Sequence, residues 1–136
     1  MQIIVLSHGP MAEGMVQSAT MIIGPRQNVT SLTLKREDEI GYFKDRLRAM
    51  LDSFGDEEVI CLTDLLHGSP FNAVVSQMGD FPVAHLTGAN LAMVIQACIR
   101  SKTKNMTARK LCAELAELRS TSVVDVNSLF ENDTEE

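Results

Sequence analysis

Hydrophobic positions along the chain fall into short apolar runs that alternate with stretches of helical spacing. Four runs are short, apolar or alternating, and bounded by turn-forming residues, which is typical of strands: Ile3–Ser7, Asn28–Leu34, Glu58–Asp64 and Phe81–Gly88. Apolar residues recur at helical spacing in five further segments: 10–24, 36–55, Ser69–Met78, a segment from about Asn90, and 107–120. A last short strand is predicted within residues 121–130.

This alternation of strand and helix predicts an α/β fold. Strands separated by helices form a mainly parallel sheet with right-handed crossovers, and helices then cover both faces. The final strand follows a pair of helices, so it can join antiparallel at a sheet edge. The 136 residues suffice for one core, and we expect a single domain over residues 1–130 with an acidic tail over 131–136.

Charge and cysteine content narrow the functional classes. The formal net charge is −6 and the pI is about 5.0, which argues against nucleic acid as a partner because phosphate backbones favour a basic surface. No apolar run approaches the ~20 residues that span a bilayer. The start of the chain does not resemble a signal peptide, and the three cysteines are far apart in apolar stretches. We therefore expect reduced, buried thiols and a cytoplasmic protein.

Polar residues and glycines follow three of the predicted strands. His8 and Gly9 end the first strand, Asp64 ends the third, and Asn90 follows the fourth. Sites in open parallel sheets form beyond the carboxyl ends of strands. Imidazole is a nucleophile near neutral pH, and if the first and third strands are neighbours, Asp64 can orient the ring of His8. A turn histidine and a helix-capping acid are the ordinary explanations.

The turn Gly68-Ser69-Pro70 predicts the start of a helix, with Ser69 as N-cap and Pro70 at the first helical position. The free N–H groups of a helix start bind anions, although an ordinary cap is the better explanation of these residues when they are taken alone. Taken with His8 and Asp64, the turn completes a nucleophile, an orienting acid and a phosphate cradle. Neither GxxxxGK[ST] nor GxGxxG occurs, and no metal-ligand spacing or cofactor motif is present.

Three segments together resemble the IIA domain of the mannose class of the bacterial sugar phosphotransferase system: "VLSHGPMAEGM", "LTDLLHGSPFNA" and "LTGANLAMV". The resemblance runs from Met1 to about residue 126. It implies a doubly wound sheet of four parallel strands and a homodimer that exchanges a fifth, antiparallel strand, for which "TSVVDVN" is the candidate.

By the same resemblance, His8 accepts phosphate from the carrier HPr and passes it to a IIB component during sugar uptake, with the membrane components IIC and IID acting downstream. Asp64 orients His8, which would leave Nε2 to carry the phosphate. Gly68 and Ser69 hold the phosphoryl oxygens, and no metal or other cofactor takes part. Gly9, His67 and Asn90 are possible edges of the site. The resemblance does not name the sugar.

Two features depart from the family pattern. His67 stands where the family usually has a glycine, and we expect it to occupy a tolerant turn position without a role. Family members are often fused to a IIB domain, whereas this chain ends in acidic residues, so we expect a separate subunit.

Two alternatives remain open: a regulatory IIA-like domain, as in the dihydroxyacetone kinase system, and a binding module that has lost transfer. His85 lies within "PVAHLTG", and we expect it to be a strand histidine with its hydrogen bonds satisfied, not a ligand.

Overall fold

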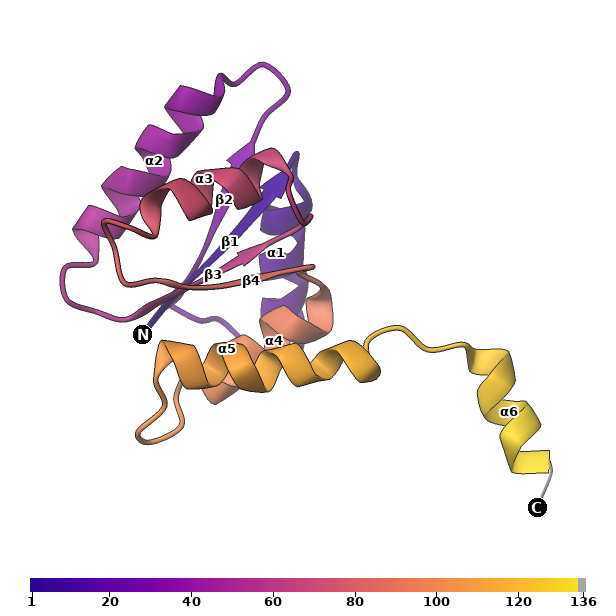
Figure 1. The fold of residues 1–136 in the computed structure, drawn as a ribbon. Helices are drawn as coiled ribbons and strands as arrows, with labels where there is room; N and C mark the ends of the chain where they lie inside the picture. Colours follow the sequence, from indigo (N-terminus) through magenta and orange to yellow (C-terminus); the bar gives the residue numbers. More distant parts are fainter. Residues whose placement is uncertain (135–136) are drawn as a thin grey trace.

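The computed structural model, which describes residues 1–134, is a four-stranded sheet with helices on both faces (Figure 1). Its elements are β1 (Gln2–His8), α1 (Met11–Ile23), β2 (Val29–Leu34), α2 (Ile40–Ser53), β3 (Val59–Thr63), α3 (Ser69–Gln77), β4 (Ala84–Thr87), α4 (Leu91–Arg100), α5 (Ala108–Ala116), the 3₁₀ turn η1 (Glu117–Ser120) and α6 (Val126–Thr134).

The sheet is wholly parallel, with the strand order β2-β1-β3-β4. The order reverses beside β1, because β2 lies on one side of it and β3 on the other. The register pairs Leu6 of β1 with Thr63 of β3. The first and third strands are therefore neighbours, as the argument for a shared site requires, and the doubly wound α/β fold is confirmed.

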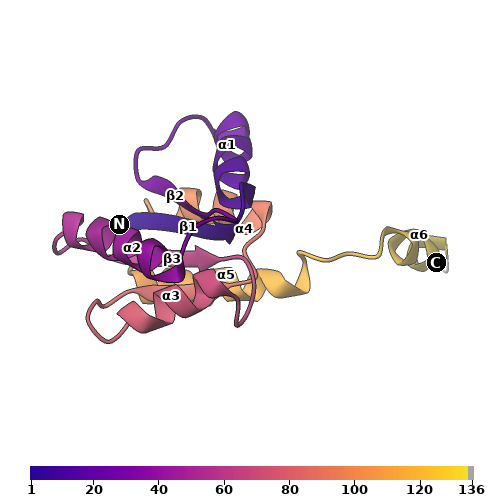
Figure 2. The same cartoon turned by 90° about the horizontal axis from the view of Figure 1, so that it is seen from above.

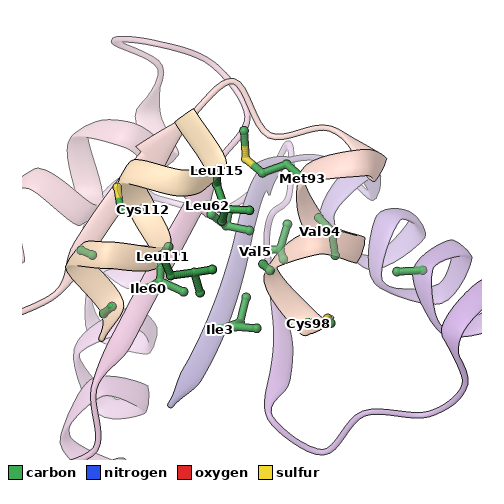
Figure 3. Packing of buried hydrophobic residues seen from close by; sticks show 14 of the residues in the cluster. Ile3, Val5, Ile60, Leu62, Met93, Val94, Cys98, Leu111, Cys112 and Leu115 are labelled. Atoms are coloured by element: carbon green, nitrogen blue, oxygen red, sulfur yellow. The ribbon is translucent and has the colours of Figure 1, made fainter. Parts of the chain in front are cut away.

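Successive residues of the central strands point to opposite faces of the sheet, and both faces are covered. Ile3 and Val5 pack with α1, α4 and α5, whereas Ile4 and Leu6 pack with α2 and α3. Figure 3 shows the first of these cores, where side chains of β1 and β3 meet those of α4 and α5. Burial on both sides explains why the strands read as continuous apolar runs instead of alternating ones.

All three cysteines are buried and free, as expected. Cys61 lies in the core under α2 and α3, and Cys98 and Cys112 lie in the opposite core. Burial raises the pKa of Cys61 to about 12. The thiols therefore serve as small apolar side chains.

Three predicted boundaries were wrong. Helix α2 begins at Ile40 and not at residue 36, since Asp38 accepts the N–H of Lys35 and closes a turn there. Strand β4 begins only at Ala84, after Pro82, which has no N–H to pair. The N-cap of α3 is Gly68, which makes Ser69 the first helical residue. The predicted cap of α5 is confirmed, because Thr107 accepts the N–H of Lys110.

The structure of the single chain does not show the predicted C-terminal strand. Residues 121–125 form no strand, and α6 follows them and lies away from the body of the molecule (Figures 1 and 2). A strand needs a hydrogen-bonded neighbour, and none of the described strands pairs with this segment. Asp125 instead starts α6, where its carboxylate accepts from Ser128. Strand exchange in a dimer stays a prediction.

Helix α6 runs across the expected boundary between residues 130 and 131, and residues 135–136 of the expected tail lie outside the described residues. Among residues 1–134, no helix has the length and apolar character to cross a bilayer.

Candidate functional site

The carboxyl ends of β1 and β3 meet at one edge of the sheet and carry the two leading candidates. His8 is the last residue of β1, and Asp64 follows directly after β3. His8 is about half exposed (47%), whereas the side chain of Asp64 is only 8% exposed. The pair thus presents an accessible ring that is supported from below by a buried acid.

One oxygen of Asp64 receives two hydrogen bonds from His8. The ring Nδ1 lies 2.8 Å from Oδ2, and the backbone N–H of His8 donates to the same oxygen at 2.9 Å. A carboxylate only accepts, so Nδ1 carries the ring proton and Nε2 keeps its lone pair. The backbone bond ties the strand end itself to the acid, so both the position and the tautomer of His8 are defined.

The start of α3 lies directly against the ring of His8. A Cβ placed on Gly68 would lie 2.8 Å from Cε1 of His8 and 3.1 Å from the carbonyl oxygen of Leu65. Only a residue without a side chain fits there. The absence of a Cβ at position 68 therefore brings the free Nε2 edge of His8 to the N-terminus of a helix.

The first turn of α3 has a small set of available amide donors. The N–H of Gly68 is used, because it donates to Leu65 O at 3.0 Å, and Pro70 has none. The N–H groups of Ser69 and Phe71 belong to the turn that an α-helix leaves without intrahelical acceptors. Gly68 thus contributes space and Ser69 contributes the donor, a division that the sequence did not reveal.

An open pocket of about 490 Å³ adjoins His8 on the side of α2. It is lined by His8, Gly9 and the segment from Leu34 to Ile40, including the cations Lys35 and Arg36. Gly9 has a φ of +61° and donates its N–H to Leu34 O at 2.8 Å. The glycine thus turns the chain sharply out of the strand, and its role at the edge of a site stays a prediction.

Two expected edge residues are not in contact with His8. His67 is exposed, and its ring packs edge-on against Phe71 with 5.4 Å between the ring centroids. Asn90 is the N-cap of α4, where its side chain accepts the N–H of Met93 at 2.9 Å, and it lines a separate groove with Thr87 and Gly88. Capping accounts for Asn90 without a role at His8.

Sequence reasoning missed the packing role of three hydroxyl residues behind the site, Ser7, Thr63 and Thr87. Ser7 is fully buried and accepts the N–H of Ala12, an otherwise unpaired amide in the first turn of α1. Thr63 is also fully buried, and its hydroxyl lies 2.8 Å from Nε2 of His85 and 2.9 Å from the hydroxyl of Thr87. A signal was present, because hydroxyl residues at the ends of apolar strands require partners once buried. The expectation that His85 is a satisfied strand histidine is confirmed.

This arrangement can hold a group covalently on one ring nitrogen. An oriented imidazole with a free Nε2 supplies the nucleophile, the buried carboxylate stabilises positive charge on the ring, and the helix start favours an anion beside it. These are the properties of a phosphoryl carrier of the histidine type.

A family comparison agrees with that class. Residues 2–115 match the model of the EIIA-man family, described as the PTS system fructose IIA component. The chain therefore belongs to this family, the mannose-class IIA components of the sugar phosphotransferase system.

Solved structures share the fold over nearly the whole chain. The mannose/sorbose-specific IIA subunit of Enterococcus faecalis is 29% identical, with a TM-score of 0.83 and coverage of 91% of this chain and 92% of that one. The PTS IIA protein associated with the fucose utilization operon of Streptococcus pneumoniae is 28% identical, with a TM-score of 0.83 and 95% of both chains covered. A sigma-54 interaction domain protein of Enterococcus faecalis, at 17% identity and a TM-score of 0.74 over 89% and 91%, matches in fold alone.

Proposed function

We propose that this protein is a phosphoryl-carrier subunit in which His8 accepts phosphate from phospho-HPr and passes it to a IIB component for sugar uptake. The observation that carries the proposal is the contact of 2.8 Å between His8 Nδ1 and Asp64 Oδ2, which leaves Nε2 beside the start of α3. Membership of the mannose-class IIA family supports the same role.

In the proposed acceptor step, the lone pair of His8 Nε2 attacks the phosphorus of the phosphohistidine on HPr. The new N–P bond forms as the donor N–P bond breaks, and the electron pair of the broken bond returns to the donor ring. The ring of His8 becomes positively charged while Nδ1 keeps its proton, and the carboxylate of Asp64 stabilises that charge. No proton has to leave the site, and transfer to IIB reverses the step.

The start of α3 has a part in the same proposal. The N–H and hydroxyl of Ser69 and the N–H of Phe71 would donate to the phosphoryl oxygens, with Gly68 leaving room for them. Positioning and preorganised donors supply most of the catalysis in phosphoryl transfer. No metal is required by this scheme.

The surface around His8 suits a protein partner. Four exposed apolar side chains come from the segments that follow the strand ends: Met11, Ile40, Leu65 and Leu66. Lys35 and Arg36 line the adjoining pocket. Apolar side chains around an exposed reactive group favour docking of another protein. We assign this rim to HPr and IIB, and we propose that the protein acts in the cytoplasm as a homodimer, with the membrane components reached through IIB.

The test is incubation with phosphoenolpyruvate, the upstream kinase and HPr, followed by intact-mass measurement. One acid-labile phosphate on the wild type, absent from His8→Ala, is expected. No phosphate with a demonstrably phosphorylated HPr would overturn the proposal. Addition of the IIB component then separates transport from the regulatory alternative, because phosphate that stays on His8 would favour regulation.

A further inference from the structure

A partly buried histidine, His85, joins the two halves of the candidate site from behind. It lies on β4, one strand beyond the strand that carries Asp64, and it pairs with Cys61 in the ladder. Its ring reaches Thr63, the residue before Asp64, through a contact of 2.8 Å. The same ring packs against Phe71 of α3, with centroids 5.0 Å apart and planes inclined by 42°.

The two partners of His85 belong to different parts of the site. Thr63 is the last residue of β3, so its position sets the backbone from which the side chain of Asp64 extends. Phe71 lies in the first turn of α3, two residues after Ser69, and its own N–H is one of the donors of that turn. A single ring therefore spans the strand end that orients His8 and the helix start that faces Nε2.

The hydroxyl groups define which nitrogen of His85 bears the proton. Thr87 Oγ1 donates to the carbonyl oxygen of Thr63 at 3.4 Å, and Thr63 Oγ1 donates to Thr87 Oγ1 at 2.9 Å. With the hydroxyl protons placed in this way, Thr63 Oγ1 accepts from the ring. This arrangement favours the Nε2–H tautomer of His85, the opposite of His8.

Burial keeps this ring neutral. Desolvation lowers the pKa of His85 to about 4, so near neutral pH it donates one hydrogen bond and carries no charge beside the phosphoryl site. A neutral donor that also offers an aromatic face can serve Thr63 and Phe71 at once. Phenylalanine would keep the face and lose the donor, and glutamine would do the reverse.

We propose that His85, as the Nε2–H tautomer, is a positioning residue that aligns Asp64 and the first turn of α3 for transfer at His8. The inference rests on the proposed phosphoryl-carrier function and deepens it. His85 itself does not touch the transferred group; it acts through Thr63 and Phe71.

The expected kinetic signature is a loss in kcat without a change in KM for phospho-HPr. His85 and Thr63 lie under the surface on which a carrier docks, so binding of the carrier should not depend on them. Misalignment of a reacting group costs rate steeply, and we expect His85→Phe and Thr63→Val to lower kcat roughly tenfold or more. His85→Gln, which keeps a donor for Thr63, should recover part of the loss.

A matched control is Thr30→Val. Thr30 lies on the edge strand β2, opposite Ile4, and its hydroxyl makes no hydrogen bond within residues 1–134. This variant makes the same chemical change as Thr63→Val away from the site and should transfer phosphate at the wild-type rate. Urea unfolding of every variant shows which of them are folded under the assay conditions.

The tautomer is measured on the wild type, which avoids any variant that fails to fold. Long-range ¹H–¹⁵N NMR of the labelled protein should show His85 protonated at Nε2 and His8 at Nδ1. An Nδ1–H tautomer at His85 would contradict the proposal, as would folded His85→Phe and Thr63→Val variants with wild-type kcat. If the wild type takes no phosphate from competent phospho-HPr, the proposed function fails instead, so the two failures are distinguishable.

Discussion

The carboxylate oxygen Oδ2 of Asp64 holds His8 twice, through the ring Nδ1 at 2.8 Å and through the backbone N–H at 2.9 Å. The two residues are 56 positions apart in the chain and meet because β1 and β3 are neighbours. The acid therefore determines both where the ring lies and which nitrogen is free.

Asp64→Asn should slow phosphorylation of His8 while leaving the fold intact. The amide oxygen can still accept one hydrogen bond, but it carries no charge to stabilise the phosphorylated, positively charged ring. We expect the rate of phosphate uptake from phospho-HPr to fall roughly ten- to a hundredfold, measured by quenched-flow mass spectrometry.

Asp80→Asn is the control for that change. Asp80 is an exposed acid that pairs with Arg48 at 3.0 Å and is remote from His8 in the contacts it makes. Its variant should take up phosphate at the wild-type rate. An Asp64→Asn protein that matches Asp80→Asn in rate would show that the carboxylate is dispensable.

Gly68→Ala should disturb the site through packing alone. The new Cβ would meet the ring of His8 at 2.8 Å and Leu65 O at 3.1 Å, so either the ring or the turn must shift. We expect a loss of about 1–3 kcal/mol in the free energy of unfolding and a slower uptake of phosphate.

Gly14→Ala provides the matched comparison. Gly14 lies inside α1, and a Cβ there meets nothing within 4 Å. Alanine favours the helix by about 0.5–1 kcal/mol, so this variant should gain stability and keep the wild-type rate. Chemical denaturation and the phosphate assay on both variants separate the steric effect from a general effect of alanine.

His67 occupies a left-handed backbone conformation, with φ of +65°, at an exposed turn. A non-glycine residue there costs about 1–2 kcal/mol. We expect His67→Gly to be more stable than His67→Ala by about 1 kcal/mol, because both lose the ring contact with Phe71 but only glycine relieves the backbone.

Neither His67 variant should alter the rate of phosphate uptake, if the turn position has no role in transfer. Urea unfolding and the mass assay measure the two expectations separately. A rate loss in both variants at unchanged KM would assign a function to the imidazole of His67.

The partly buried ring of His85 makes stability depend on pH. Its pKa falls from the usual 6.5 to about 4 on folding, so the unfolded chain binds a proton more readily. The free energy of unfolding should therefore decrease as pH falls from about 6.5 towards about 4, with no further loss from this group below that.

His85→Gln should remove the pH dependence that His85 contributes. The difference in free energy of unfolding between the wild type and this variant should therefore shrink as pH falls through the same window. Urea unfolding at several pH values between about 7 and about 4.5 measures it. Thr30→Val, with His85 intact, should retain the full dependence. If the difference in free energy of unfolding between the wild type and His85→Gln stays constant across the window, the pKa shift does not belong to His85.

Local sequence patterns correctly predicted the elements for which burial pattern and capping residues pointed to the same structure. The continuous apolar runs around Ile4 and Ile60 specified strands buried on both faces, and Thr107 marked a helix start that its hydroxyl indeed caps. Two helix starts were misplaced by local signals. Asp38 closed a turn before α2, and Gly68, where a Cβ would meet His8, replaced Ser69 as N-cap. The segment after residue 120 has strand-like composition, yet it finds no partner strand in the described chain.

The sequence by itself determined the doubly wound α/β class, the candidate nucleophile His8, and the presence of an acid and a helix start that could serve it. Only the tertiary structure decided that Asp64 Oδ2 meets Nδ1, that Gly68 makes room for the ring, and that His85 links Thr63 to Phe71. The reason is physical: periodicity records which residues are buried, whereas contacts between residues 22 or 56 positions apart depend on strand order and register, which no local pattern encodes.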